Sequence, residues 1–286
     1  MTDTARPALA LTGVSGHIGS MVARLLADSG YVFRMLARKA SLDRLPQYEG
    51  CPRCPFVYGD DPSTRAALQG VDTVLMVSAR ESLDRVKEHQ GFVDAALAAG
   101  VRQIVYISFD AASDDADFTL GRDHYATEEY IKKSGLDYTF LRDNFYLEAL
   151  ISWAQPGTIA GPAGDGKVSA VSQKDVAAVA AAVLRNPRLH SGRTYTLTGP
   201  EAFTLQEFAD RLTKAGRKTT YKNETLEEAY ASRREAYQVP QWELDAWVSS
   251  YTAIASGRLS GVTHDIELVT GHAPLSIEDV LRSQEE

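Results

Sequence analysis

Apolar runs of strand length alternate with helix-like segments through the first half of the chain. The expected strands are residues 8–12, 31–37, 55–59, 73–78, 103–109 and 138–142. The expected helices are residues 16–30, 61–70, 84–100 and 121–135. Strands and helices that alternate in this way form βαβ units, in which helices cover both faces of a parallel sheet. The pattern therefore predicts an α/β fold with a Rossmann-type doubly wound parallel sheet.

The pattern loosens after about residue 145. A Gly/Pro-rich loop is expected at 155–167, followed by a helix at 173–186, a strand at 193–199, a capped helix at 204–216 and a strand at 218–223. Mostly helical sequence follows to the end of the chain. We expect residues 1–150 to form a Rossmann domain and residues 151–286 to form a smaller α/β lobe, with the chain crossing between the two.

A glycine-rich turn separates the first expected strand from the first expected helix. In "LTGVSGHIG" the glycines are Gly13, Gly16 and Gly19. Glycine allows a tight turn and close approach of the backbone to a pyrophosphate, which the N–H groups and dipole of the following helix stabilise. The alternative is a purely structural turn. The residues predicted to contact a dinucleotide here are Thr12, Gly13, Ser15, Gly16, His17, Ile18 and Gly19.

The end of the second expected strand indicates which dinucleotide binds. NAD sites usually place an Asp or Glu there, which accepts a hydrogen bond from the ribose 2′-hydroxyl. This chain has Arg38 and Lys39 instead. Their cationic groups can pair with a 2′-phosphate, and no carboxylate competes. The alternative is a pair of solvated basic side chains. We predict that the cofactor is NADP(H).

Further cofactor contacts are expected at the carboxyl ends of the strands, where ligands of doubly wound sheets bind. Asp60 follows the third expected strand, and it either hydrogen-bonds the adenine or caps the helix that begins at Pro62. The fourth strand should end beneath the cofactor and the fifth near the nicotinamide, with the residues Val77, Ser78 and Ala79, and Ser108 and Phe109.

Composition argues against several classes of partner. The 286 residues carry a net charge of −8, whereas general nucleic-acid binding needs clustered Lys and Arg. No apolar stretch reaches the roughly 18 residues of a membrane span, so we expect a cytoplasmic protein without a membrane partner. Cys51 and Cys54 form one CxxC pair between two prolines. We expect a loop with two reduced thiols rather than a redox or zinc site.

Three segments together resemble a known family: "TGVSGHIG", "FTLGRDHYATEEYIKKSGLDYTFLRDNFY" and "GPAGDGKVSAVSQKDVAAVAAAVL". The chain resembles NmrA-like atypical short-chain dehydrogenase/reductases. Within that group it is most similar to the bacterial NADPH-dependent quinone oxidoreductases and triphenylmethane-dye reductases. The resemblance covers nearly the whole chain and implies a Rossmann domain, NADP(H) and a small substrate lobe. It also implies that Asn144, Phe145 and Tyr146 pack beside the nicotinamide.

The resemblance bears directly on His124. Counted back from "SGLDYT", His124 occupies the position of the lysine in the usual Tyr/Lys pair, and Leu120 occupies that of the tyrosine. His124 is therefore our candidate catalytic residue, since an imidazole with an ordinary pKa of about 6.5 suits proton transfer. Glu128, one helical turn on, is expected to hold its tautomer. A helix-start histidine bonded to backbone is the plainer alternative.

Aromatic residues after the sixth strand suggest where a flat acceptor binds. Phe145, Tyr146 and Trp153 can form an aromatic wall, although each fits equally well in a core between lobes. Trp242 and Trp247 are expected in the core of the C-terminal helices.

These features predict an NADPH-dependent reductase of quinones or similar flat electrophiles, without metal or flavin. The alternative is a non-catalytic NADP(H)-sensing NmrA-like regulator that acts through a protein partner. A third alternative is a reductase or isomerase of secondary metabolism. A homodimer remains open under each of them.

Overall fold

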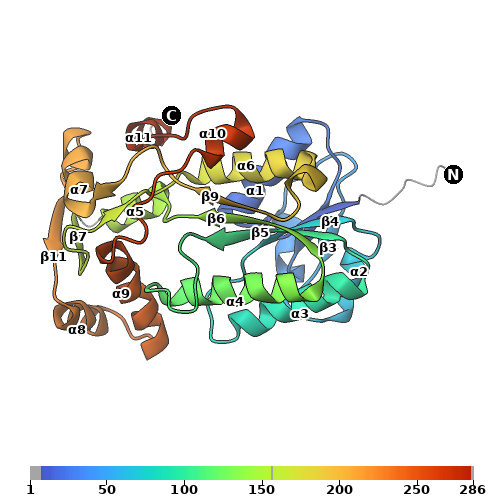
Figure 1. The fold of residues 1–286 in the computed structure, drawn as a ribbon, viewed down its shortest axis with the longest axis horizontal. Coiled ribbons are helices and arrows are strands. Elements are labelled where there is room, and N and C mark those ends of the chain that lie inside the picture. Colours follow the sequence, from blue (N-terminus) through green and yellow to red (C-terminus); the bar gives the residue numbers. More distant parts are fainter. Residues whose placement is uncertain (1–7, 156, 285–286) are drawn as a thin grey trace. The chain divides into compact units, whose positions relative to one another are not determined.

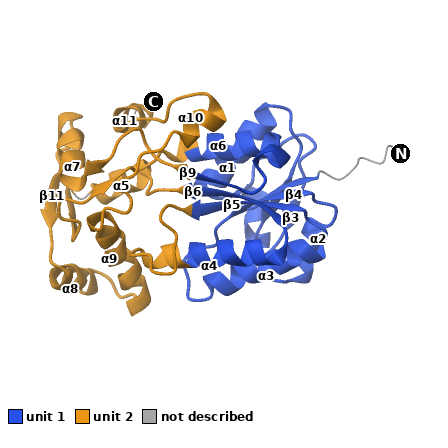
Figure 2. Cartoon of the chain, in the orientation of Figure 1, with its two compact units in different colours: residues 1–108, 123–142, 176–195 blue, residues 109–122, 143–175, 196–286 orange. Residues whose placement is uncertain are grey.

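The computed structural model describes residues 8–155 and 157–284. Residues 1–7, Pro156 of the expected Gly/Pro loop and residues 285–286 lie outside the described part. The chain forms two compact units, each assembled from three stretches of sequence (Figure 2). Unit 1 comprises residues 1–108, 123–142 and 176–195. Unit 2 comprises residues 109–122, 143–175 and 196–286.

Unit 1 is built on a central sheet. Its strands, in the described part of the chain, are β1 (Leu9–Leu11), β2 (Arg34–Ala37), β3 (Arg53–Pro55), β4 (Thr73–Val77), β5 (Gln103–Phe109), β6 (Asp137–Asp143) and β9 (Arg193–Leu197). Their order is β3-β2-β1-β4-β5-β6-β9. The pairs β1–β2, β1–β4, β2–β3 and β4–β5 are parallel. The predicted α/β class with a doubly wound parallel sheet is confirmed.

Helices cover both faces of this sheet (Figure 1). One face carries α1 (His17–Asp28) and α6 (Gln173–Arg185), and the other carries α2 (Pro62–Leu68), α3 (Arg85–Ala98) and α4 (Thr119–Ser134). Two short 3₁₀ helices, η1 (Lys39–Arg44) and η2 (Pro187–His190), follow β2 and α6. On the α2–α4 face the core is formed by Phe92, Tyr106 and Phe140, which are fully buried. Burying such large apolar side chains supplies most of the stability of a layered domain.

The third strand lies earlier than the apolar run at 55–59 indicates. β3 is Arg53–Pro55, in register with Met35 to Ala37 of β2. The strand ends before Val57 because the backbone of Val57 bonds to α2 and not to β2. The hydroxyl of Thr64 in α2 donates to the Val57 carbonyl at 2.6 Å. Cys54 therefore lies in a strand and not in the expected loop, whereas Cys51 is buried just before that strand.

Unit 2 combines short strand pairs with helices. Strand β7 (Thr158–Gly161) pairs in parallel with β11 (Thr220–Asn223), and β8 (Lys167–Val168) pairs antiparallel with β10 (Phe203–Thr204). The helices are α5 (Leu147–Trp153), α7 (Leu205–Lys214), α8 (Leu226–Ala236), α9 (Gln241–Ala255), α10 (Asp265–Thr270) and α11 (Ile277–Ser283). The prediction of a loop over 155–167 is wrong for β7 and for Lys167, because pairing partners about 60 and 36 residues later order these segments.

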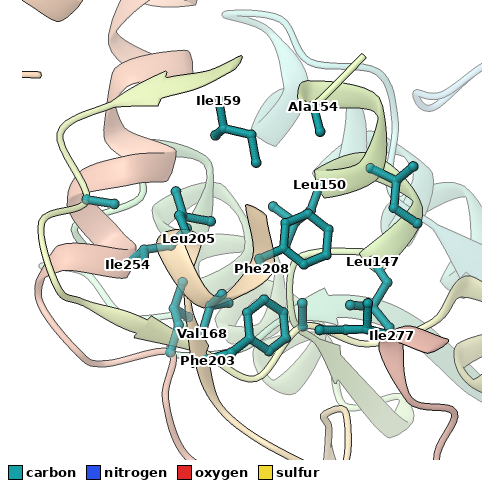
Figure 3. Packing of buried hydrophobic residues seen from close by; sticks show 14 of the residues in the cluster. Leu147, Leu150, Ala154, Ile159, Val168, Phe203, Leu205, Phe208, Ile254 and Ile277 are labelled. Atoms are coloured by element: carbon teal, nitrogen blue, oxygen red, sulfur yellow. The ribbon is translucent and has the colours of Figure 1, made fainter. Parts of the chain in front are cut away.

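The core of unit 2 gathers side chains from most of these elements. Figure 3 shows Leu147 and Leu150 of α5, Phe208 of α7 and Ile254 of α9 packed together. Helices α7 and α8 each begin with a capping box, in which Thr and Glu side chains satisfy the free N–H groups of the first turn. Such caps contribute about 1 kcal/mol each and explain why these helices begin where they do.

Candidate functional site

The glycine-rich loop joins β1 to α1 in unit 1. Gly13 has φ +67°, a left-handed conformation that only glycine adopts without strain. Gly16 is the N-cap of α1, and no side chain caps the first turn. Ser15, Gly16 and His17 are exposed. The first-turn N–H groups are therefore accessible to an anion, as dinucleotide binding requires.

Close contacts explain why glycine is needed at two positions of this loop. A Cβ atom on Gly19 would lie 2.3 Å from the carbonyl oxygen of Gly13. A Cβ atom on Gly13 would lie 2.7 Å from the Cβ of Val77, at the end of β4. The structure thus brings the loop directly against the end of β4, where the sequence also predicted cofactor contacts. The loop geometry fits a bound pyrophosphate.

Thr12 anchors the loop to β4. Its hydroxyl donates to the carbonyl of Leu75 at 3.1 Å and accepts from the N–H of Val77 at 2.9 Å. The hydroxyl of Tyr58 lies 2.9 Å away and donates to the carbonyl of Val77. The buried Thr12 side chain therefore holds the ends of two strands together.

The predicted nucleotide-selecting residues lie at the end of β2. Arg38 is the N-cap of η1 and Lys39 its first residue, and both are exposed. Asp60 is exposed and forms an ion pair with Arg65, whose hydrogen bond lowers the pKa of the Asp60 carboxyl. The cap of α2 is Asp61, which accepts from the N–H of Ser63 at 2.8 Å. Asp60 is thus not the helix cap, and its carboxylate reaches solvent.

The peptide at Ala79, just beyond β4, is held by two side chains of α3. The N–H of Ala79 donates to Nε2 of His89 at 2.8 Å. The carbonyl of Ala79 accepts from Nε of Arg85 at 3.1 Å. Arg85 is buried, and its Nη1 lies 3.7 Å from the Asp123 carboxylate. Among the described residues, that nitrogen has no hydrogen-bond partner.

His124, the candidate catalytic residue, lies on α4 beside this cluster and is 7% exposed. Its Nε2 is 3.2 Å from Nη2 of Arg85, and its Nδ1 is 3.0 Å from the hydroxyl of Tyr106 in β5. Because a guanidinium can only donate, Nε2 accepts and the proton resides on Nδ1. Nδ1 therefore donates to the Tyr106 hydroxyl.

The environment keeps the His124 ring neutral. Burial, followed by the positive charge of Arg85, lowers the pKa of His124 well below 6.5. His89 has the same protonation pattern, since its Nε2 accepts from Ala79 and its Nδ1 donates to Thr127 at 2.8 Å. Burial and Arg85 lower the pKa of His89 to about 3. The expectation of an ordinary imidazole pKa at His124 is therefore wrong, because the ring is buried beside the guanidinium of Arg85.

Glu128 has different partners from those expected. Its buried carboxylate accepts from Nε of Arg142 at 2.9 Å, from Nη2 of Arg142 at 2.6 Å and from the hydroxyl of Ser108 at 2.6 Å. The tautomer of His124 is set instead by Arg85 and Tyr106. Ser108, predicted near the nicotinamide, thus has its hydroxyl bound within unit 1.

The remaining predicted residues lie in unit 2. Phe145 contacts the rings of Phe109 and Trp153 at centroid distances of 5.2 and 5.9 Å. Tyr146 donates a hydrogen bond to Asp143. The buried amide of Asn144 donates toward Asp110, Ser169 and the carbonyl of Leu259. Phe109, Phe145 and Trp153 are thus brought together as one aromatic group, whereas Asn144 organises its own loop.

Sequence reasoning missed Arg85, His89 and Tyr106. Arg85 and His89 of α3 hydrogen-bond to the backbone of Ala79, and Tyr106 of β5 hydrogen-bonds to the ring of His124. His89 and Arg85 are four residues apart, which puts them on one helix face. That spacing was a usable signal, whereas Tyr106 sits inside a continuous apolar run and has none.

A family model described as NAD(P)H-binding matches residues 13–187 of the chain. The chain belongs to this family. Quinone oxidoreductase 2 of Escherichia coli is 31% identical over 95% of this chain and 96% of its own length. The crystal structure of that enzyme with NADPH has a TM-score of 0.87 and covers 97% of this chain and 100% of its own.

Two further reductases match over nearly their whole length. The NAD(P)H azoreductase of Xenophilus azovorans is 32% identical over 91% of this chain and 92% of its own. The triphenylmethane reductase of Citrobacter sp. with NADP(H) is 27% identical, with a TM-score of 0.82, and covers 96% of this chain and 99% of its own. The predicted NmrA-like family, nicotinamide cofactor and reductase class are confirmed. The regulator alternative has less support, because these relatives are named for reductase activity.

Neither a bilayer-spanning helix nor a metal-binding cluster occurs in the described part of the chain. Across residues 8–155 and 157–284, no helix has both the length and the apolar content for a bilayer crossing. Within the same residues, no cluster of three or more His, Cys, Asp or Glu is arranged to hold a metal ion.

Proposed function

We propose that the chain reduces a quinone, or a similarly flat electrophilic acceptor, with NADPH. The observation that carries the proposal is the open glycine loop before α1, in a chain that aligns end to end with a quinone oxidoreductase. The bound dihydronicotinamide supplies a hydride, that is, two electrons and one proton. With one further proton from solvent, the quinone becomes a hydroquinone and the cofactor becomes NADP⁺.

Unit 1 residues are proposed to hold the cofactor. The uncapped N–H groups at the start of α1 bind the pyrophosphate, and Gly13 and Gly19 allow its close approach. The exposed Arg38 pairs with the 2′-phosphate, which gives preference for NADPH over NADH. The backbone of Val77 to Ala79 lies beneath the cofactor, held in place by Thr12 and His89.

We propose that His124 takes part as a neutral imidazole. A ring whose pKa lies well below 6.5 carries no transferable proton at neutral pH on its acceptor nitrogen. Its contribution is then to position Arg85 and Tyr106, which lie within 3.2 Å of it. An His124→Asn variant should lower kcat without removing any inflection of the pH profile near neutrality. An inflection near pH 6.5 that disappears in this variant would show an ordinary acid–base histidine instead.

The absorbance of NADPH, followed with a panel of quinones and triphenylmethane dyes, tests the reaction. We expect turnover with at least one quinone. Tight NADPH binding without turnover of any member of the panel would overturn the reductase proposal and favour an NADP(H) sensor. A cytoplasmic location and a homodimer remain predictions. Size-exclusion chromatography with light scattering tests the homodimer.

A further inference from the structure

Unit 2 contains an open pocket of about 540 Å³ that none of the predicted cofactor residues lines. Ligand sites in proteins commonly measure roughly 300–1,000 Å³ and are lined mainly by apolar and aromatic groups. The walls come from α5, β7, α8 and α9, and we call this the α8–α9 pocket. Its aromatic lining residues are Trp153, Tyr237, Trp247 and Tyr251.

The aromatic rings of the α8–α9 pocket are arranged as two pairs. Trp153 stacks on Tyr251 with centroids 5.0 Å apart and planes 29° apart. Tyr237 meets the edge of Trp247 at 5.2 Å and 79°. Tyr237 is 55% exposed, and Trp247 is half-buried. Accessible aromatic rings gathered around one cavity are typical of sites that bind small molecules.

The position of Tyr251 depends on a glycine in β7. A Cβ atom on Gly161 would lie 2.3 Å from Cδ1 of the Tyr251 ring. The glycine therefore lets the ring lie flat against the strand and form one wall of the cavity. Arg233 completes that wall, with its guanidinium 5.1 Å from the centroid of the Tyr251 ring.

The one cation among the lining residues, Arg233, already has hydrogen-bond partners, and its carboxylate partner is shared with Lys222. Nη1 of Arg233 donates to the carboxylate of Glu224 at 3.1 Å, and Nη2 donates to the carbonyl of Ala160 at 2.9 Å. The Glu224 side chain is 2% exposed, so the ion pair is held inside unit 2. An anionic ligand would find no unpaired positive charge here, whereas an uncharged ring system would lose little solvation on entering. Ser152 adds a hydroxyl group that can donate to a carbonyl oxygen.

We propose that the α8–α9 pocket binds an uncharged, flat aromatic molecule of naphthoquinone size, stacked against Trp247 and Trp153. The identity of this ligand as the electron acceptor rests on the proposed function. The binding site itself rests on the aromatic rings, the volume of the cavity and the bonded state of Arg233. Stacked aromatic pairs stabilise a complex beyond the apolar area that they bury.

Isothermal titration calorimetry with 1,4-naphthoquinone, without NADPH, tests binding separately from turnover. Trp247→Leu should raise the Kd by tenfold or more, and Tyr237→Ser, at an exposed position, should raise it several-fold. Trp242→Leu is the matched control, because Trp242 is on the same helix but does not line the pocket. Its Kd should equal that of the wild type. The 2-sulfonate of the same quinone should bind at least tenfold more weakly.

The outcomes separate this proposal from the proposed function. Unchanged naphthoquinone affinity in Trp247→Leu and Tyr237→Ser would overturn the pocket, and so would equal or tighter binding of the sulfonate. If the wild type oxidises NADPH with naphthoquinone and Trp247→Leu keeps the same KM, the pocket is wrong while the reductase stands. If binding depends on Trp247 but no NADPH is oxidised, the reductase is wrong while the binding site stands.

Discussion

Acidification should destabilise the protein through two buried, neutral histidines, His89 and His124. Burial, and then the charge of Arg85, lowers the pKa of His89 from 6.5 to about 3. Burial and the same guanidinium lower the pKa of His124 well below 6.5. In the fold both rings accept a hydrogen bond on Nε2 and are buried away from bulk solvent, which would otherwise stabilise a charge. In the unfolded chain each ring takes up a proton near pH 6.5.

The size and sign of the effect follow from proton linkage. Between pH 6.5 and 3 the unfolded chain binds more protons at His89 than the folded chain does. The stability due to the neutral ring is therefore complete above pH 6.5 and is lost as the pH falls toward 3. At pH 5, about 1.5 units below the unfolded pKa, the loss is about 2 kcal/mol for His89. The loss from His124 has the same sign. A loss of about 2 kcal/mol is already a substantial part of the roughly 5–15 kcal/mol that stabilises a typical domain.

Urea denaturation at pH 7 and pH 5, followed by circular dichroism, measures this loss. Carboxyl groups with ordinary pKa values near 4 titrate mostly below this window, so the histidines dominate it. Gln can accept the hydrogen bond from Ala79, and His89→Gln should reduce the loss between the two pH values by about 2 kcal/mol. His264→Gln is the control, because the His264 side chain is 90% exposed. An equal loss in the wild type and His89→Gln would refute the argument that burial keeps this ring neutral.

Three further predictions address the cofactor loop and the second buried ion pair. Arg38→Ala should raise the Kd for NADPH roughly 10–100-fold, as loss of a charged hydrogen bond implies, and leave that for NADH nearly unchanged in fluorescence titrations. Gly19→Ala should abolish NADPH binding in the same assay while circular dichroism stays native, because its Cβ would lie 2.3 Å from the Gly13 carbonyl oxygen. Arg142→Ala should lower the free energy of unfolding by about 3–5 kcal/mol, because it leaves Glu128 buried and unpaired, and adding Glu128→Gln should recover part of that loss in urea denaturation.

The strands of the central sheet could be predicted from sequence where burial is continuous. Residues 103–109 were expected as a strand, and β5 is Gln103–Phe109 with every residue buried. A strand covered on both faces must be apolar throughout, so the run and the strand coincide. β3 shows the limit of this reasoning. The apolar side chains of Phe56 and Tyr58 pack in the core after the strand has ended, because Thr64 binds the backbone of Val57.

Strand β7 could not be found by local reasoning. Its residues, Thr158–Gly161, lie in a Gly/Pro-rich stretch that reads as a loop. Its ladder is formed with β11, whose residues come about 60 positions later, and Gly161 in it makes room for the ring of Tyr251. The β-propensity of the residues in one segment does not indicate which distant segment will pair with it.

The geometry of the glycine loop could be predicted from the sequence, whereas the surroundings of His124 could not. The glycine loop is local, so the turn, the helix start and the need for Gly13 and Gly19 could be anticipated. The protonation state of His124 could not be predicted in this way, because its hydrogen-bond partners, Arg85 and Tyr106, come from elements that are distant in the sequence. Counting residues along α4 suggested Glu128 as its partner, whereas the structure pairs Glu128 with Arg142.

The balance of charge in unit 1 bears on the source of the second proton in quinone reduction. Arg85 is near Asp123 and Arg142 is paired with Glu128, so the buried ions around His124 sum to zero. Protonating His124 would add an uncompensated charge beside Arg85, in a region with little water to screen it. We therefore expect the ring to stay neutral during the proposed quinone reduction. We infer that the second proton of the hydroquinone comes from solvent, and that kcat should show a solvent isotope effect that His124→Asn leaves unchanged.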